Sequence, residues 1–235
     1  MTTPEPPPHR VTRPVGSGRT PPGKTYDDPV LSAMASRRSV SKVGPGAPDD
    51  AELLALLAAV TPVADHKALR PWRLLTLRGD ARLRLGEALD AAAGTVRDPG
   101  DVNPKPLRAD LLVALVARHT PHPKVPAWEQ EATAAGVGHL LGLALWQAGW
   151  GVMWRTGLLT DAPAVRAVHG LDDHEKLLGW LYVGTIEESF RARLQNSSRP
   201  PLDPTQFLGS VPGTPAPGAG AGDEVDAHTV RPDDE

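Results

Sequence analysis

Residues 124–157 form the stretch that most constrains the fold of this chain. Its sequence, KVPAWEQEATAAGVGHLLGLALWQAGWGVMWRTG, predicts a helix of about six turns that ends at Gly149. A strand then leads into the corner Trp154-Arg155-Thr156-Gly157. Apolar side chains cover almost the whole circumference of the helix, at Val137, Leu140, Leu141, Leu143, Ala144, Leu145 and Ala148. A helix that is apolar on all sides is either a core helix or half of a subunit interface.

The two ends of the chain have a different composition from its middle. Residues 1–27 and 209–235 are rich in Pro, Gly, Ser and charge and contain few large apolar side chains. Such segments cannot bury enough surface to offset their chain entropy, so we expect a disordered N-terminal arm and a disordered C-terminal tail. Residues 28–208 are long enough for a single domain with a substantial core.

The composition excludes several classes of site and partner. The chain has no cysteine, which rules out disulfides and thiolate metal sites and fits a reducing cytoplasm. It has no signal peptide pattern and no apolar run of about 18 residues, so we expect a soluble cytoplasmic protein. The net charge of −3 gives no reason to expect nucleic acid or membrane partners. We find no zinc-ligand spacing, Walker loop or nucleophile elbow, so no metal site is predicted.

Periodicity and capping signals place the other elements. Helices are expected from Asp28-Pro29 towards Arg37, over 50–60 and 81–94, and from Asp161 to Gly170; strands are expected at 73–78, 111–116, 150–154 and 177–185. Pro71 favours an extended Arg70. The polar stretch 96–106 is expected to be a mobile lid. This order predicts a mixed arrangement of helices and strands, with one sheet covered on both faces.

Three glycines in the long helix, Gly136-x-Gly138-x-x-x-Gly142, resemble part of a dinucleotide-binding fingerprint. That fingerprint requires glycines at the turn between a strand and a helix N-terminus, where free N–H groups meet the pyrophosphate. Here the glycines lie inside the predicted helix, after Trp128-Glu129-Gln130-Glu131. We therefore interpret them as sites of close packing against a neighbouring element.

Arg37-Arg38-Ser39 is open to two interpretations. Two guanidinium groups and a hydroxyl can bind a phosphate or the polar edge of a heterocycle. Equally, cations at a helix C-terminus are favoured by the helix dipole without any ligand. The histidines are also ambiguous, because His66 could pair with Asp65 whereas His139 fits a packed or interface position. Residue chemistry alone therefore predicts a soluble domain with a candidate anion site.

Four separated motifs together resemble the flavin-dependent nitroreductase family, and within it the YdjA-like branch. They are Arg37-Arg38-Ser39, ADHKALRPWRLLTL at 64–77, KVPAWEQE at 124–131, and WGVMWRTG at 150–157 followed by LGWLYVGT at 178–185. The resemblance extends over residues 29–208. It implies an α+β three-layer sandwich with a mixed, mostly antiparallel sheet flanked by helices. It also implies a homodimer with FMN sites at the subunit interface.

The resemblance implies a role for specific residues of this chain. Arg37, Arg38 and Ser39 would hold the FMN phosphate and ring edge from one subunit. From the other subunit, His66 and the loop around Pro62 would reach the same flavin. The remaining candidates are Trp154, Arg155 and Thr156 beside the ring or phosphate, Arg70 where the family commonly has Gln, and Arg199 as the C-terminal basic residue. NADH or NADPH would reduce the flavin, and a nitroaromatic or quinone-like acceptor would be reduced in ping-pong order.

Three alternatives stay open beside this function. A flavin-binding storage or sensing protein would hold FMN with little turnover of NAD(P)H. Another enzyme of the superfamily would act on a specific metabolite, which only substrate screening would identify. A cofactor-free interaction domain would be colourless after purification.

Overall fold

The computed structural model describes residues 28–196 and 202–212. The chain divides into two compact units, one ending at Ser198 and the other beginning at Arg199. In the second unit the described residues contain a 3-10 helix, η3 (Pro204–Phe207). The expected N-terminal arm, most of the expected tail, and Arg199 lie outside the described residues. The predicted domain limits therefore stay predictions.

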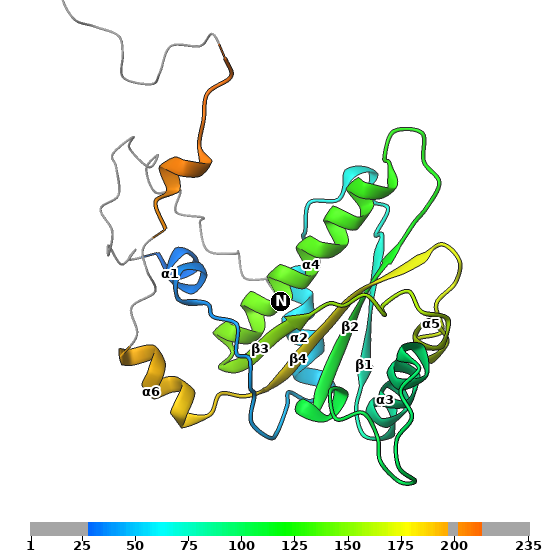
Figure 1. Ribbon diagram of the computed structural model, residues 1–235. Helices are drawn as coiled ribbons and strands as arrows, with labels where there is room; N and C mark the ends of the chain where they lie inside the picture. Colours follow the sequence, from blue (N-terminus) through cyan, green and yellow to red (C-terminus); the bar gives the residue numbers. More distant parts are fainter. Residues whose placement is uncertain (1–27, 197–201, 213–235) are drawn as a thin grey trace, which may run out of the picture. The chain divides into compact units, whose positions relative to one another are not determined.

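The first unit is built on a four-stranded sheet with the order β1-β2-β4-β3 (Figure 1). Its strands are β1 (Trp72–Leu77), β2 (Leu111–Arg118), β3 (Trp150–Arg155) and β4 (Glu175–Thr185). All three pairings are antiparallel, so the sheet expected to be mixed has only antiparallel pairs in the described residues. The four predicted strands are confirmed close to their expected bounds.

Helices cover both faces of this sheet, with α2 (Asp50–Val60) and α4 (Ala127–Gln147) on one face and α3 (Asp80–Ala93) and α5 (Pro163–Val168) on the other. The other helices are α1 (Pro29–Ser36), which packs against α4, and α6 (Glu188–Asn196), with two 3-10 helices, η1 (His66–Ala68) and η2 (Pro106–Arg108). The 3-10 helices and α6 were not predicted from the sequence. Among the described residues, no helix is long and apolar enough to cross a membrane.

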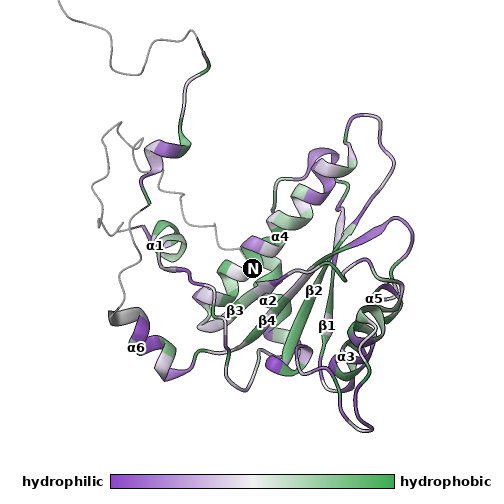
Figure 2. Ribbon diagram, in the orientation of Figure 1, coloured by the Kyte–Doolittle hydropathy of each residue, from purple (hydrophilic) through white to green (hydrophobic). Residues whose placement is uncertain are grey.

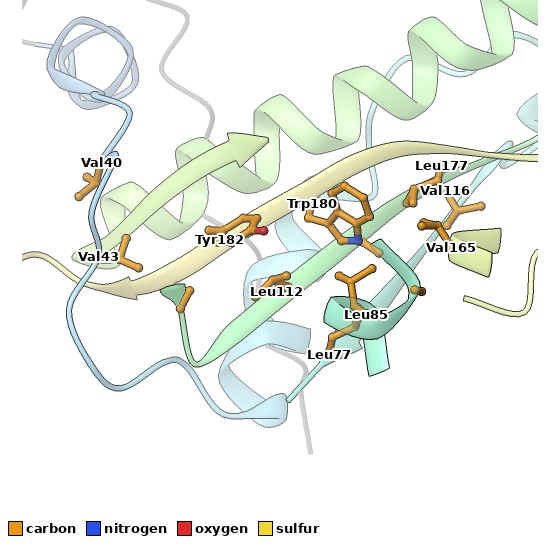
Figure 3. Close-up of a cluster of buried hydrophobic side chains, with 13 residues drawn as sticks. Val40, Val43, Leu77, Leu85, Leu112, Val116, Val165, Leu177, Trp180 and Tyr182 are labelled. Atoms are coloured by element: carbon orange, nitrogen blue, oxygen red, sulfur yellow. The ribbon is translucent and has the colours of Figure 1, made fainter. Parts of the chain in front are cut away.

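The central strand β2 divides the core into two clusters. It is buried on both faces along almost its whole length, and Figure 2 shows it in the apolar colour. Because side chains alternate along a strand, Leu111, Val113 and Leu115 pack with α2 and α4. Leu112 and Val116 belong to the opposite cluster, which includes α3 and α5 (Figure 3). The predicted α+β three-layer sandwich is confirmed.

The long helix α4 is buried along one stripe rather than on all sides. Gln130, Ala134, Val137, Leu141 and Leu145 form that stripe at a spacing of three and four residues. By contrast, Leu140 is 38% exposed and Trp128 is 70% exposed. Of the two alternatives that the sequence left open, α4 is therefore not a fully buried core helix in one protomer, where an apolar face that includes Leu140 is exposed.

The helix starts agree with their capping signals, with one exception. Asp28 accepts hydrogen bonds from the backbone N–H groups of residues 30 and 31, at 2.9 and 3.1 Å. Asp49 accepts one from residue 52 at 2.8 Å. The predicted cap Asp161 is wrong: α5 has Ala162 at its N-cap, and Asp161 instead accepts a hydrogen bond from Arg166 Nη1 at 3.0 Å. Helix α5 therefore has no side-chain cap, and Pro163 in its first turn lacks one of the N–H groups that would otherwise need an acceptor.

The connection expected to be a mobile lid is attached to the core. Asp90 of α3 is buried, and its carboxylate accepts hydrogen bonds from Arg97 and from Asn103 Nδ2, the latter at 2.8 Å. Asn103 is itself buried. The guanidinium of Arg97 holds the pKa of Asp90 below its ordinary value, with a further contribution from Asn103. The predicted lid is thus anchored at two points.

Candidate functional site

Two clefts lie on opposite faces of the edge strand β3. The first cleft has a volume of about 350 Å³ and lies between the end of α1, the middle of α4 and the sheet. It is lined by Met34, Arg37, Ser39, Gly138, His139, Leu140, Gly142, Leu143, Val152, Trp154 and Leu181. A hydrogen bond of 3.3 Å from Trp146 Nε1 of α4 to the Ser36 hydroxyl connects α1 to α4 beside it.

The second cleft has a volume of about 580 Å³ and lies on the α3 and α5 side of the sheet. It is lined by Leu89, Lys105, Arg108, residues 153–160, Trp180 and Tyr182. Three of its side chains are cations, namely Lys105, Arg108 and Arg155. Among the residues that the structure describes, Trp154 is the one that lines both clefts.

A β-bulge in β4 sets the position of this end of β3. The register between β2 and β4 shifts beside Leu115, and Gly179 in β4 has φ +122°. A side chain at Gly179 would collide with the carbonyl oxygen of Arg155. The indole Nε1 of Trp154 donates a hydrogen bond of 3.2 Å to the carbonyl of Leu178. The Trp154-Arg155 corner therefore packs directly against the backbone of β4 at Gly179, which only a residue without a side chain allows.

Arg155 has an unsatisfied donor at the second cleft. Its Nη2 donates to the carbonyl of Ser41 at 2.8 Å, and its guanidinium lies 5.3 Å from the centre of the Tyr182 ring. Its Nε is buried and has no hydrogen-bond partner among the described residues. Burial raises the pKa of Tyr182, although Arg155 acts in the opposite direction. A buried donor without a partner suggests that a ligand acceptor completes the site.

In the Arg37-Arg38-Ser39 turn, one residue caps the helix and two line a cleft, so each of the two interpretations of this sequence applies to part of the turn. Arg38 Nη1 donates to the carbonyl oxygens of residues 35, 36 and 37 at 2.9 to 3.0 Å, so it caps the C-terminus of α1. Arg37 and Ser39 line the first cleft, and Arg37 Nη1 lies 3.5 Å from the Ser39 hydroxyl. Arg37 and Ser39 are therefore the members of this turn that face a ligand cleft.

Pro62, His66 and Arg70 line neither cleft of the same protomer. Their loop lies along the N-terminal half of α4, where His66 Nδ1 is 2.8 Å from Glu129 Oε1. Glu129 precedes His139 by ten positions on α4, which corresponds to about 15 Å along the helix axis. The structure therefore separates these three candidates from Arg37, Ser39 and Trp154.

The backbone of this loop departs from two expectations. Asp65 does not pair with His66, because its carboxylate accepts from the N–H groups of Leu69 and Arg70 at 3.1 and 2.7 Å. Arg70 is not extended: its φ is +49°, and its carbonyl accepts from the N–H of residue 72 at 2.8 Å. Lys67 and residue 68 also have positive φ. Strained backbone of this kind is concentrated at ligand sites, where surrounding contacts maintain it.

Several lining residues were missed in the sequence. Lys105 immediately precedes the short helix η2 and Arg108 is its last residue, and no motif marks them as ligand contacts. His139 is exposed at the first cleft, with its ring 4.9 Å from the Trp154 ring and inclined by 64°. These side chains come from the segment around η2 and from α4, and packing of these elements around the sheet brings them to the clefts that Trp154 lines, which local sequence does not reveal.

Comparison with known proteins decides the family of this chain. The family model described as "Nitroreductase family" matches residues 34–185. The chain belongs to the nitroreductase family. This confirms the resemblance found in the sequence, including the YdjA-like branch: the chain is 32% identical over 183 residues to "Putative NAD(P)H nitroreductase YdjA" of Escherichia coli K12, covering 76% of this chain and 97% of that protein. A Haemophilus influenzae protein named "Putative NAD(P)H nitroreductase" is 27% identical over 66% of this chain and 88% of its own length.

Solved structures of nitroreductases share the fold at low sequence identity. A nitroreductase-like family protein from Bacillus cereus gives a TM-score of 0.64 at 19% identity, covering 81% of this chain and 99% of that chain. A nitroreductase with bound FMN from Bacteroides fragilis gives 0.56 at 22% identity, covering 68% and 90%. The FMN-dependent NfnB from Mycobacterium smegmatis, in complex with NADPH, gives 0.58 at 19% identity, covering 77% and 97%.

Proposed function

We propose that this chain is an NAD(P)H-dependent oxidoreductase that binds FMN around Trp154 and reduces nitroaromatic or quinone-like acceptors by a ping-pong mechanism. Membership of the nitroreductase family supports this assignment, as do the NAD(P)H nitroreductase names of its relatives. The FMN-bound and NADPH-bound neighbours in the same fold add further support.

The observation that carries the proposal is the set of donors around Trp154. Arg37 and Ser39 lie on one side of β3, and Lys105 and Arg155 lie on the other. Arg155 Nε is buried and lacks a partner among the described residues, so a donor is already desolvated there. Cationic and hydroxyl donors suit a phosphate and the carbonyl edge of a flavin ring. The residues present therefore fit FMN.

Each residue has a distinct role in this proposal. Arg37 and Ser39 hold the phosphate or the polar ring edge, while Arg38 fixes the end of α1 and keeps its other N–H groups available. Lys105 and Arg155 favour negative charge on a ring bound beside them. Bound FMN supplies the hydride chemistry between the nicotinamide and the acceptor, so the protein needs no triad of catalytic side chains.

We propose that the functional unit is a homodimer. The α4 face that includes Leu140 is exposed in one protomer, and Val30 and Met34 of α1 are more than half exposed. A second copy that covered this surface would bring its loop with Pro62, His66 and Arg70 to the site. This explains why the loop lines neither cleft of its own protomer, although its backbone is strained.

The test compares FMN binding by three forms of the protein. Replacing Arg37 and Arg38 together with Ala should abolish the yellow colour that copurifies with the protein. Arg84→Ala is the control, because Arg84 is an exposed arginine of α3 that lines neither cleft, and this variant should retain wild-type FMN content. Full FMN occupancy in the double variant would refute the assignment of the site.

Steady-state NAD(P)H oxidation then tests the reaction. With a quinone or a nitroaromatic as acceptor, an oxidoreductase should turn over many times per bound FMN. The ping-pong order predicts parallel lines in double-reciprocal plots at several acceptor concentrations. Bound FMN with negligible turnover would favour a storage or sensing role instead.

A further inference from the structure

Trp180 connects the wall of the second cleft to the protein core. It projects from β4 into the cluster that contains Leu85 and Val165, and only 5% of its surface is exposed (Figure 3). It also lines the second cleft together with Tyr182. Its indole Nε1 donates a hydrogen bond of 2.9 Å to Nε2 of His169. The orientation of this wall therefore depends on the acceptor that His169 provides.

The contacts of His169 define one neutral tautomer. His169 follows α5 as its C-cap and is 5% exposed. An indole N–H can only donate, so Nε2 of His169 must be unprotonated to accept from it. The other ring nitrogen, Nδ1, lies 2.7 Å from the carbonyl oxygen of Val165 and must carry the proton that it donates there. Both ring nitrogens are thus occupied only when the imidazole is neutral.

Charged groups near His169 also favour the neutral ring. Burial lowers its pKa below the ordinary value of 6.5, the hydrogen bond to the Val165 carbonyl acts against this, and Arg73 on β1 lowers it further. Of the other ionised groups on the elements packed here, Arg166 of α5 is hydrogen-bonded to Asp161 and to two carbonyls. Glu175 of β4 is paired with Arg73 and Arg118, and Asp90 of α3 is paired with Arg97. Among the described residues of these elements, no carboxylate forms a hydrogen bond or an ion pair with the imidazole, whose partners are the Val165 carbonyl and the Trp180 indole.

We propose that His169 is a positioning residue of the flavin site: it holds the Trp180 indole as a fixed wall of the second cleft, and so sets the affinity of that cleft for a planar ring. The proposal rests on the proposed function for the identity of the ring. Without the acceptor, the indole N–H would be buried and unpaired, and the indole would have to rotate towards the cleft to reach water or another acceptor.

Two variants separate hydrogen bonding from packing. His169→Gln keeps an acceptor near the position of Nε2, whereas His169→Phe keeps a ring of similar size without an acceptor. FMN affinity is measured by flavin fluorescence quenching, and exchange of the Trp180 indole proton is measured by NMR. We expect the Phe variant to bind FMN roughly tenfold more weakly and to exchange that proton faster, the usual effect of an unpaired buried donor. The Gln variant should remain within about twofold of the wild type.

A second background tests whether the effect passes through Trp180. In a Trp180→Phe background there is no indole N–H, so adding His169→Phe should leave FMN affinity unchanged. Acidification should weaken FMN binding more in the wild type than in His169→Gln, because only the wild type can protonate Nε2. Rescue by Gln and loss of the effect in the Trp180→Phe background would not follow from a packing role alone.

The outcomes distinguish this proposal from the proposed function. Absence of FMN binding by the wild type would overturn the proposed function and, with it, the flavin-affinity role of His169. If the wild type binds FMN, equal affinity and equal indole exchange in the Phe and Gln variants would overturn the positioning role alone. A tenfold loss confined to the Phe variant would support it.

Discussion

Replacing Arg73 should destabilise the protein strongly, because it would leave a buried carboxylate with too few partners. The Glu175 side chain is 2% exposed. Arg73 Nε and Nη2 donate to its two oxygens at 2.7 and 2.6 Å, and Arg73 Nη2 also donates to the Gly170 carbonyl at 3.0 Å. This bidentate geometry is the strongest arrangement of an arginine and a carboxylate. Arg73→Met removes the guanidinium but keeps much of the apolar length of the side chain.

The magnitude follows from what remains around Glu175. Breaking a buried ion pair by removing one partner costs about 3–5 kcal/mol. Here Arg118 Nε still lies 3.1 Å from Oε1, and the N–H of Asp172 still donates to Oε2 at 3.2 Å. These contacts compensate in part, so we expect a loss of about 3 kcal/mol in the free energy of unfolding, the lower end of that range.

Arg118→Met is the matched control, because it removes a second arginine from the same carboxylate. The Arg118 side chain is 50% exposed and contacts one oxygen only, so its loss should cost about 0–1 kcal/mol. Urea denaturation followed by circular dichroism, at one fixed protein concentration, measures both variants. In Arg73→Met/Glu175→Leu no charge is left buried, and stability should return to within about 1 kcal/mol of the wild type. Equal losses in the two single variants would refute this account of Glu175.

Further predictions concern α4, pH and the site. Gly138→Ala should destabilise by about 1 kcal/mol, because its Cβ would lie 2.6 Å from Leu115 Cδ2 and 3.2 Å from the Trp154 ring. Gly142→Ala meets nothing within 4 Å and should stabilise by up to about 1 kcal/mol. Denaturation midpoints measure both variants: a higher midpoint for Gly138→Ala would contradict the first prediction, and a lower one for Gly142→Ala would contradict the second. The lowered pKa of His169 means that the unfolded state binds more protons below pH 6.5, so stability should fall as the pH decreases through that window, by at most about 1.4 kcal/mol per unit. The pKa of Glu175 is lowered from 4.5, chiefly by Arg73, so its contribution is present above that pH and is lost as the pH falls through the folded-state value. The free energy of unfolding, measured by denaturation at a series of pH values, tests both predictions. His169→Gln should reduce the pH dependence of stability just below pH 6.5 and leave the pH dependence below 4.5 unchanged.

Local patterns in the sequence were sufficient for most of the fold. The continuous apolar run of β2, the Asp28-Pro29 start of α1 and the acidic start of α2 all depend on neighbouring residues, and the structure has each of them. Asp161 was wrong as a cap because Ala162 takes the N-cap position of α5 and the Asp161 carboxylate accepts from Arg166 instead. Arg70 was wrong as an extended residue because Asp65 accepts hydrogen bonds from the backbone of the loop and holds it in a turn.

The site was less accessible from the sequence because it depends on contacts between distant segments. Arg37, Ser39 and Trp154 could be named from motifs, and the first cleft brings them together. Lys105 and Arg155 line the same cleft although they are far apart in the sequence. Only the tertiary packing brings them together, and no local pattern predicts it. The pairing of His169 with Trp180 likewise links a helix end to a strand. The loop with Pro62, His66 and Arg70 requires a second copy for its proposed role, which one protomer does not contain.

The central claim is that FMN binds around Trp154, and the FMN content of the purified full-length protein tests it most directly. The protein should be incubated with excess FMN, passed through a desalting column, and its visible absorbance spectrum recorded. We predict that flavin absorption bands elute with the protein at one FMN per protomer, and that the Arg37→Ala/Arg38→Ala variant elutes without them. A colourless wild-type protein after this treatment would contradict the account.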